Sequence, residues 1–206
     1  MLERRIVVTG KLFGMKDPMA AAEAVVREVR EVVSAVSAEE ASALIEAVEA
    51  ARRVYVTGMG RSGLVAGSFA MRLVHLGFQA HVVGEMTAPA VKENDILVAI
   101  SGSGTTRTVL AQVEAALQAG ASVAGVTANR DGPLTQMVRD SGGAVLVIPA
   151  ALGIRHGGEG IVPTIQYGGS LFEQSTLVFL DSVALAIAAR QGKTEDDMLS
   201  RHSNLE

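Results

Sequence analysis

The stretch Asp95-Ile-Leu-Val-Ala-Ile-Ser-Gly-Ser-Gly-Thr-Thr-Arg107 predicts a buried strand that runs directly into a ligand-binding turn. Its first part, Ile96 to Ile100, is an uninterrupted apolar run, which is typical of a strand buried in a sheet. Glycine and hydroxyl residues occupy 101–106, and apolar residues at helical spacing follow from Val109. We therefore expect a strand, a tight turn and a helix that begins near Thr105.

The turn at 101–106 has the composition of an anion site. Glycines such as Gly102 let the backbone approach a ligand closely, and the first N–H groups of the following helix lack partners and carry partial positive charge. Ser103 alone would also serve as an ordinary N-cap of that helix. Because Ser101, Ser103 and Thr106 together offer more hydroxyl groups than a cap requires, we favour a phosphate site.

From Arg53 onward, strand-like and helix-like segments alternate. The expected strands lie at 54–57, 80–83, 96–100, 122–127 and 144–148, and the expected helices at 64–76, 105–119, 133–139 and about 170–190. This order predicts an α/β fold with a doubly wound five-stranded parallel sheet, of flavodoxin-like or Rossmann-like type. Ligands of such sheets bind beyond the carboxyl ends of the strands, which is where the turns at 58–63 and 101–106 are expected.

The first 52 residues have a different pattern, so we divide the chain into an N-terminal helical arm, 1–52, and an α/β domain, 53–206. Pro18 suits the first turn of a helix, and an apolar stripe with spacings of three and four continues from Met19 to Ala35. Ser37-Ala-Glu-Glu40 is a capping box that opens a second helix. We expect both helices to lie in the arm, outside the sheet.

Composition and charge exclude several functional classes. The chain of 206 residues has a formal net charge of −4, 3% aromatic residues and no tryptophan, which argues against a nucleic-acid partner. It has no cysteine, so thiolate metal sites and a cysteine nucleophile are excluded. The N-terminus lacks the apolar core of a signal peptide, and the apolar stretches are interrupted short of a membrane span. We expect a cytoplasmic protein that has no membrane partner.

The turn Gly58-Met-Gly-Arg-Ser-Gly63 matches the glycine pattern of dinucleotide-binding turns, and Glu85 follows a little over twenty residues later. Glu85 lies beyond the end of the expected second strand, however, and a dinucleotide fold would leave the turn at 101–106 without a function. The two turns are better explained as two walls of one sugar-phosphate site. The residues assigned to the first wall are Gly60, Arg61 and Ser62. An ordinary surface arginine is the alternative interpretation of Arg61.

Four segments carry a resemblance to a known family: Gly58-Met-Gly-Arg-Ser-Gly63, Ser101-Gly-Ser-Gly-Thr-Thr106, Ser170-Leu-Phe-Glu-Gln174 and His202-Ser-Asn-Leu-Glu206. They are similar to the sugar isomerase (SIS) superfamily and, more closely, to its 6-phospho-3-hexuloisomerases. The resemblance extends from about Ala21 to the C-terminus. Family members often carry Pro-Met-Gly before the Phe-Glu pair, whereas this chain has Gln-Tyr-Gly-Gly, so the local loop geometry is expected to differ.

The resemblance implies conversion of D-arabino-hex-3-ulose 6-phosphate to fructose 6-phosphate in the ribulose monophosphate pathway. It implies no metal and no organic cofactor, a homo-oligomer (dimer or tetramer), and functional coupling to hexulose-phosphate synthase. Another aldose–ketose isomerase, such as one acting on arabinose 5-phosphate, stays open as an alternative. So does a non-catalytic sugar-phosphate sensor, which would keep the phosphate turn and dispense with a base.

Such an isomerisation needs a base that moves a proton between adjacent carbons through an enediol or enediolate. A carboxylate whose pKa is raised by burial suits this role, and the resemblance assigns the role to Glu173. The same residue also completes the pattern of a capping box, Ser170-Leu-Phe-Glu173, in which it would only close a helix end. The glycine-rich stretch at 150–169 before it is expected to be a mobile active-site loop.

Three further residues receive weaker interpretations. The C-terminal segment resembles the family ending, so His202 is expected to reach an active site, either of its own chain or of a neighbouring subunit, and to move a hydroxyl proton or open the sugar ring. A solvated terminal histidine is the alternative. Glu85 matches a family segment near the sugar. Asp181 is expected to be a buried, partnered structural carboxylate, and no pair of histidine or acidic residues has the spacing of a metal site.

Overall fold

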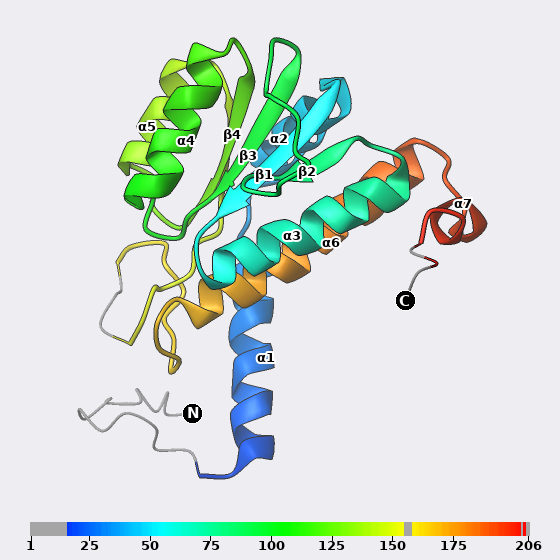
Figure 1. Cartoon of the computed structure of the whole chain (residues 1–206). Helices are drawn as coiled ribbons and strands as arrows, with labels where there is room; N and C mark the ends of the chain where they lie inside the picture. The colour runs from blue at the N-terminus through cyan, green and yellow to red at the C-terminus, as the bar shows by residue number, and fades with distance from the viewer. Residues whose placement is uncertain (1–15, 155–157, 203, 205–206) are drawn as a thin grey trace.

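The computed structural model describes residues 16–154, 158–202 and 204, which form one parallel sheet with helices on both faces (Figure 1). The strands are β1 (Arg53–Gly58), β2 (Ala80–Val82), β3 (Asp95–Ile100), β4 (Ser122–Thr127) and β5 (Ala144–Val147). Their order in the sheet is β2-β1-β3-β4-β5, and every neighbouring pair is parallel. The predicted α/β class and five-stranded parallel sheet are thus confirmed.

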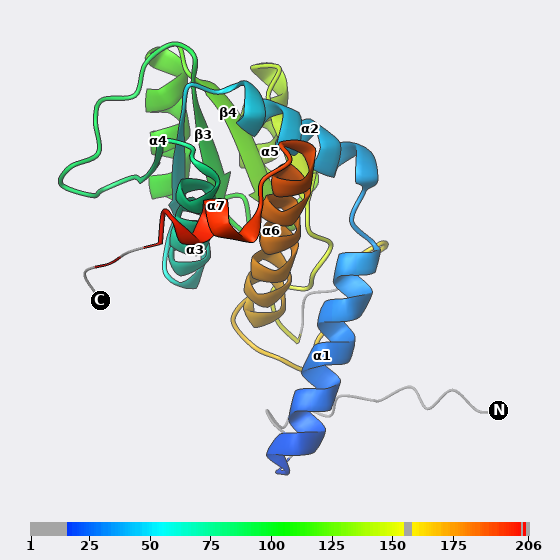
Figure 2. The ribbon, with the colours of Figure 1, turned by 90° about the vertical axis from the view of Figure 1, so that its right-hand side faces the viewer.

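Seven helices accompany the sheet in the described part of the chain. They are α1 (Pro18–Ser34), α2 (Ala38–Ala50), α3 (Arg61–Leu76), α4 (Arg107–Gln118), α5 (Pro133–Asp140), α6 (Ser170–Arg190) and α7 (Glu195–Leu199). The helices α4 and α5 cover one face of the sheet, whereas α2, α3 and α6 lie on the other (Figures 1 and 2). This two-sided cover is the doubly wound arrangement that the alternating pattern predicts.

The central strand β3 connects the two apolar cores. All six of its residues are buried, because helices cover both sides of the sheet and successive side chains point to opposite faces. Ile96, Val98 and Ile100 belong to the core under α3 and α6, and Leu97 and Ala99 belong to the core under α4 and α5. An apolar run without polar interruption is therefore what this position requires.

The helix α2 lies against the sheet, which differs from the arm that we expected it to form with α1. Its Leu44, Ile45 and Val48 are buried in the core with α3 and α6, whereas α1 extends away from the sheet toward the N-terminus (Figure 2). A stripe of apolar residues shows that a helix packs on something, but the stripe does not show on what. The division of the chain at residue 53 stays a prediction.

The capping box predicted at the start of α2 is only half formed. Ser37 Oγ accepts a hydrogen bond from the Glu40 N–H at 3.2 Å, but the Glu40 carboxylate does not return to the cap. Instead its Oε2 accepts from the Val147 N–H at 2.8 Å and its Oε1 pairs with Arg130 at 2.9 Å. Glu40 thereby satisfies an N–H of the edge strand β5 and fixes α2 to the sheet.

The helix α6 corrects our expectation that the apolar stretches fall short of a membrane span. By length and composition alone its 21 residues could cross a membrane, with a mean hydropathy of 1.5 over an 18-residue window. Half of that window is buried within the protein, where Phe172, Leu180 and Ile187 contribute to the core. Its apolar composition is explained by its place between α1, α2 and α3.

Candidate active site

The site is built where the direction of chain winding reverses. From β1 the chain passes to α3 on one face of the sheet, and from the neighbouring strand β3 it passes to α4 on the other face. The register places Gly58, the last residue of β1, opposite Ile100, the last residue of β3. The two glycine turns therefore begin side by side at the carboxyl edge, at the switch point where ligands of doubly wound sheets bind.

The first turn brings the start of α3 onto the end of β1. A Cβ on Gly58 would lie 2.7 Å from backbone atoms of Ser62, so only glycine permits this approach. Gly60 is the N-cap with a φ of 59°, and no side chain caps the helix. The helix α3 begins at Arg61, three residues earlier than expected, so the first N–H groups of the helix face this edge of the sheet.

The second turn is organised by its own hydroxyl groups. Ser101 is buried, and its Oγ lies 3.0 Å from Thr106 Oγ1. Ser103 Oγ accepts from the N–H of Thr105 at 3.3 Å and from its hydroxyl at 3.0 Å. The helix α4 begins at Arg107 with Thr106 as N-cap, and no side chain caps it. Ser103 is therefore not an ordinary N-cap, and the helix N-terminus is open to a ligand.

Residues at the end of β4 and directly after it hold the second turn in place, and sequence reasoning missed them. The carbonyl of Gly102 accepts from the Ala128 N–H at 3.0 Å and from the Thr127 hydroxyl at 3.2 Å. The side-chain amide of Asn129 donates to the Ser103 carbonyl at 3.1 Å. The sequence did contain a signal for them, because polar residues that follow a neighbouring parallel strand lie at the same edge of the sheet. Such bonds preorganise the turn before a ligand arrives.

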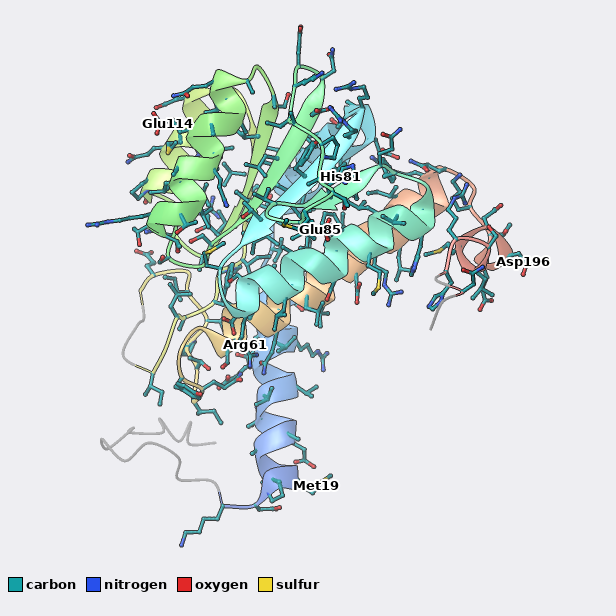
Figure 3. All side chains as sticks on the ribbon, in the orientation of Figure 1. Met19, Arg61, His81, Glu85, Glu114 and Asp196 are labelled. Carbon is teal, nitrogen blue, oxygen red and sulfur yellow. The ribbon has the colours of Figure 1, made fainter. Side chains whose placement is uncertain are left out.

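Glu173 lies at the start of α6, in contact with the glycine turn at 58–63. Its Oε2 accepts from Arg61 Nε, and its side chain is 13% exposed against 58% for that of Arg61. The N-cap of α6 is Gly169 in the left-handed region, and Ser170 is already the first residue of the helix. The predicted capping box is therefore wrong, and the carboxylate is directed to Arg61, which Figure 3 labels at the start of α3.

The start of α6 also packs on the second turn. A Cβ on Gly102 would lie 3.0 Å from Phe172 Cδ1 and 2.7 Å from Leu152 Cδ2. Phe172, next to Glu173 in sequence, is itself buried. Three segments thus meet at one place: two uncapped helix N-termini, which attract anions, and a largely buried carboxylate. This arrangement suits a phosphorylated substrate that must lose and regain a proton.

Comparison with known proteins agrees with this geometry. The SIS domain matches residues 48–140. The 3-hexulose-6-phosphate isomerase of Bacillus subtilis is 35% identical over 93% of this chain and 100% of its own length. The chain belongs to the 3-hexulose-6-phosphate isomerase family of SIS-domain proteins. The 3-hexulose-6-phosphate isomerase of Mycobacterium gastri is 40% identical over 82% of this chain and 81% of its own.

A solved structure supports the same family membership. It is that of a hypothetical protein from Methanococcus jannaschii, for which a function as 3-hexulose-6-phosphate isomerase was inferred. The two chains align with a TM-score of 0.73 and 28% identity, over 91% of this chain and 99% of the other. 3-Hexulose-6-phosphate isomerase and 6-phospho-3-hexuloisomerase are two names for one activity, so the family predicted from the four motifs is confirmed.

In this member of the family, Glu85 lies away from the contact between Arg61 and Glu173. Its Oε2 accepts from the Val82 N–H at 3.3 Å, and it lines a mostly apolar pocket of about 280 Å³. Tyr55 and Gln112 are among the other lining residues, and no residue of the 101–106 turn is. Figure 3 shows Glu85 beyond the end of β2. Its predicted place near the sugar stays a prediction.

His202 lies at the opposite end of α3 from Arg61. Its ring stacks on that of His75, with 5.2 Å between the centroids. His75 lies fourteen positions after Arg61 in the same helix, which is about 21 Å at the usual rise. Within one chain the structure therefore does not bring His202 to Glu173. Residues 203, 205 and 206 of the family ending lie outside the described residues.

Asp181 is partnered, as expected, but it is not buried. Its side chain is 43% exposed and pairs with Arg72 at 3.4 Å, so this contact joins the outer surfaces of α3 and α6. Across the described ranges, no three histidine, cysteine, aspartate or glutamate side chains form a group that could hold a metal ion.

Proposed function

We propose that this chain interconverts D-arabino-hex-3-ulose 6-phosphate and fructose 6-phosphate. The observation that carries the proposal is the placement of the Glu173 carboxylate, in contact with Arg61, beside two uncapped helix N-termini. The names of the relatives support the substrate. The same activity would place the chain in the ribulose monophosphate pathway, where hexulose-phosphate synthase supplies the substrate.

The phosphate is bound at the switch point between β1 and β3. The N-termini of α3 and α4 supply N–H groups and the positive ends of two helix dipoles. Ser62, Ser103 and Thr106 supply hydroxyl donors, and Arg61 adds a positive charge near the dianion. Ser101 is buried against Thr106, so we assign it the role of orienting that hydroxyl.

The reaction moves a carbonyl from C3 to C2 of the sugar. Glu173 removes the proton from C2, the electron pair of that bond forms the C2=C3 double bond, and the C3 oxygen gains a proton. The enediol then gives up the O2 proton, C2 becomes the carbonyl, and Glu173 returns its proton to C3. Because Arg61 contacts Oε2 of Glu173, we assign the proton transfer to Oε1.

A direct assay tests this function. The purified chain is incubated with 3-hexulose 6-phosphate, and fructose 6-phosphate is measured by a coupled enzymatic reaction. A separate incubation with arabinose 5-phosphate tests the alternative substrate. We expect turnover of the hexulose only, and incorporation of solvent deuterium into the product when the assay is run in D2O. Turnover of arabinose 5-phosphate alone would instead identify the other aldose–ketose isomerase, and no turnover of either sugar would remove the enzymatic function.

We further propose that the active form is a cytoplasmic homo-oligomer, a dimer or a tetramer. Large apolar side chains are exposed on the outer surfaces of α3 and α6: Leu64 is 73% exposed, Met71 51%, Val178 49% and Leu185 68%. Exposed apolar side chains gathered on neighbouring helices are typical of subunit contacts. Light scattering of the purified protein tests the proposal, and a monomer at micromolar concentration would contradict it.

A further inference from the structure

One carboxylate of the protruding helix α1 holds the segment that leads into α6. Glu28 Oε2 accepts from the Thr164 hydroxyl at 2.8 Å and from the Gln166 side-chain amide at 3.1 Å. Its Oε1 accepts from the Ile165 N–H at 2.8 Å. Three donors on one ionised group make a strong attachment. Thr164 is only 8% exposed, so part of this contact is shielded from water.

Hydrogen bonds lead from this attachment to the start of α6. The Gln166 N–H donates to Thr164 Oγ1 at 2.9 Å, the Ser170 N–H donates to the Tyr167 carbonyl at 3.2 Å, and the Glu173 N–H donates to the Gly169 carbonyl at 3.0 Å. No long loop therefore lies between the residues that Glu28 holds and Glu173. Residues 164–166 are thus linked to the first turn of α6 by only three intervening residues, 167–169.

Two glycines lie between the attached residues and α6. Gly168 and Gly169 have φ values of 63° and 81°, in a region that glycine enters easily and leaves just as easily. Such a pair allows the chain direction to change unless both sides are fixed. On one side the helix α6 is packed in the core. On the other side, Glu28 holds residues 164–166, and the bridge between Ala150 and Val162 holds the chain just before them.

The helix α1 is itself placed against α6, so the attachment has a rigid base. Val32, one helical turn after Glu28 and hence on the same side of α1, is fully buried in the core that contains α6. Val29 packs against the same core. Helix α1, the segment 164–166 and the start of α6 form a closed frame, and Glu173 is part of that frame.

We propose that Glu28 is a positioning residue for Glu173. By fixing residues 164–166 to α1, it sets the start of α6 and keeps the Glu173 carboxylate against Arg61 and beside the phosphate turns. The inference rests on the proposed function, because it assigns Glu173 the proton transfer. A displacement of about 1 Å at a reacting group costs up to roughly a hundredfold in rate. The protruding helix thus has a role in the chemistry through the position of Glu173.

The test compares Glu28→Ala with Glu28→Gln and with the control Glu31→Ala. Glutamine keeps an acceptor for the Ile165 N–H, and the Thr164 hydroxyl and the Gln166 amide can reorient toward its NH2 group. Glu31 lies on the same helix, carries the same charge and is exposed. We expect Glu28→Ala to lower kcat by about tenfold or more while KM changes little, because the phosphate turns keep their own hydrogen bonds. Glu28→Gln and Glu31→Ala are expected to stay near wild type.

Amide hydrogen exchange gives a readout that does not depend on catalysis. In Glu28→Ala the Ile165 N–H loses its acceptor, so its exchange is expected to accelerate, with no such change in Glu31→Ala. Unchanged kcat despite faster exchange would overturn the positioning role. If Glu28→Gln lowers both kcat and the melting temperature, Glu28 has only a general stabilising role, and the positioning role is overturned as well. Unchanged exchange would show that the attachment is absent.

The same measurements separate this inference from the proposed function. If the wild-type protein has no isomerase activity, the proposed function fails and the positioning role fails with it, while faster exchange in Glu28→Ala still reports the attachment. If the wild type is active and Glu28→Ala is equally active, the proposed function stands and only the positioning role is overturned.

Discussion

The two residues that the sequence associates with proton transfer, Glu173 and His202, contact opposite ends of α3, and the two ends offer different chemistry. At the N-terminal end Arg61 contacts Glu173, which is 13% exposed. At the C-terminal end His75 stacks on His202. A helix N-terminus attracts negative charge and a C-terminus attracts positive charge. The first end is therefore suited to a sugar phosphate, whereas the second holds a stacked pair of histidine rings.

The contrast shows what a motif can and cannot assign. Both residues were associated with the site by resemblance alone, because the Phe-Glu pair and the family ending occur in the same set of proteins. Of the two, Glu173 lies beside the turns at 58–63 and 101–106 within one chain. His202 can serve a site only if another subunit brings its C-terminal segment to the carboxyl edge of the sheet.

The largest expected effect comes from Glu173→Gln. The amide cannot accept the C2 proton, so kcat is expected to fall by roughly a hundredfold or more while binding of the sugar phosphate is retained. The control is Asp181→Asn, which neutralises an exposed carboxylate of the same helix and should leave kcat near wild type. Steady-state kinetics and a binding titration with fructose 6-phosphate make the comparison. Retained turnover in Glu173→Gln would refute the catalytic role.

A smaller effect is expected at the phosphate turn. Ser103→Ala removes a hydroxyl donor to a charged group, which costs about 1–3 kcal/mol and corresponds to a rise in KM of roughly 5- to 150-fold. The inhibition constant of inorganic phosphate should rise in parallel, because the lost contact is to phosphate and not to the sugar. Ser182→Ala, at an exposed position of α6, is the control. Unchanged KM and unchanged phosphate inhibition would contradict the assignment.

How far the sequence predicts this site depends on how local each feature is. The strand β3 and the turn after it were predictable, because an apolar run and a glycine-rich, hydroxyl-rich turn are properties of consecutive residues. The order of the two turns along the sheet followed from general rules for parallel strands. The contacts of Asn129 with the turn and of Glu28 with residues 164–166 join distant segments, and no periodicity in the chain encodes them.

Local patterns also gave wrong predictions where another feature of the fold competed with the pattern. Ser170 and Glu173 have the spacing of a capping box, but Gly169 in the left-handed region takes the N-cap position and releases Glu173 to Arg61. Glu40 similarly leaves its own cap for the N–H of Val147. In both cases a glutamate in the first turn of a helix pairs with a residue distant in the sequence, Arg61 for Glu173 and Val147 for Glu40, which the sequence pattern could not reveal.

A still smaller effect is expected from His202→Asn, and it sharpens the contrast most directly. If His202 completes a neighbour's site through one hydrogen bond to a sugar hydroxyl, its loss costs roughly tenfold in kcat. Mixing His202→Asn subunits with Glu173→Gln subunits should then restore activity above that of either variant, because some shared sites receive both intact residues. Full activity of His202→Asn on its own would end this role, and no gain on mixing would exclude sharing between subunits.

The smallest expected effect is on stability, at the C-terminal end of α3. Burial of its ring, followed by the nearby charges of His202 and Arg72, lowers the pKa of His75 below its usual value. In the unfolded chain this histidine gains its proton near pH 6.5, so on acidification the unfolded state binds protons before the folded state does. The free energy of unfolding therefore decreases as the pH falls from about 6.5 through the lower pKa of the folded protein. His75→Phe keeps the stacked ring and removes the titration, so its urea midpoint should change less between pH 7.5 and 5.5 than that of wild type. An equal change in both proteins would show that His75 does not contribute to the pH dependence of stability, and the two ends of α3 would then differ only in the chemistry of Glu173.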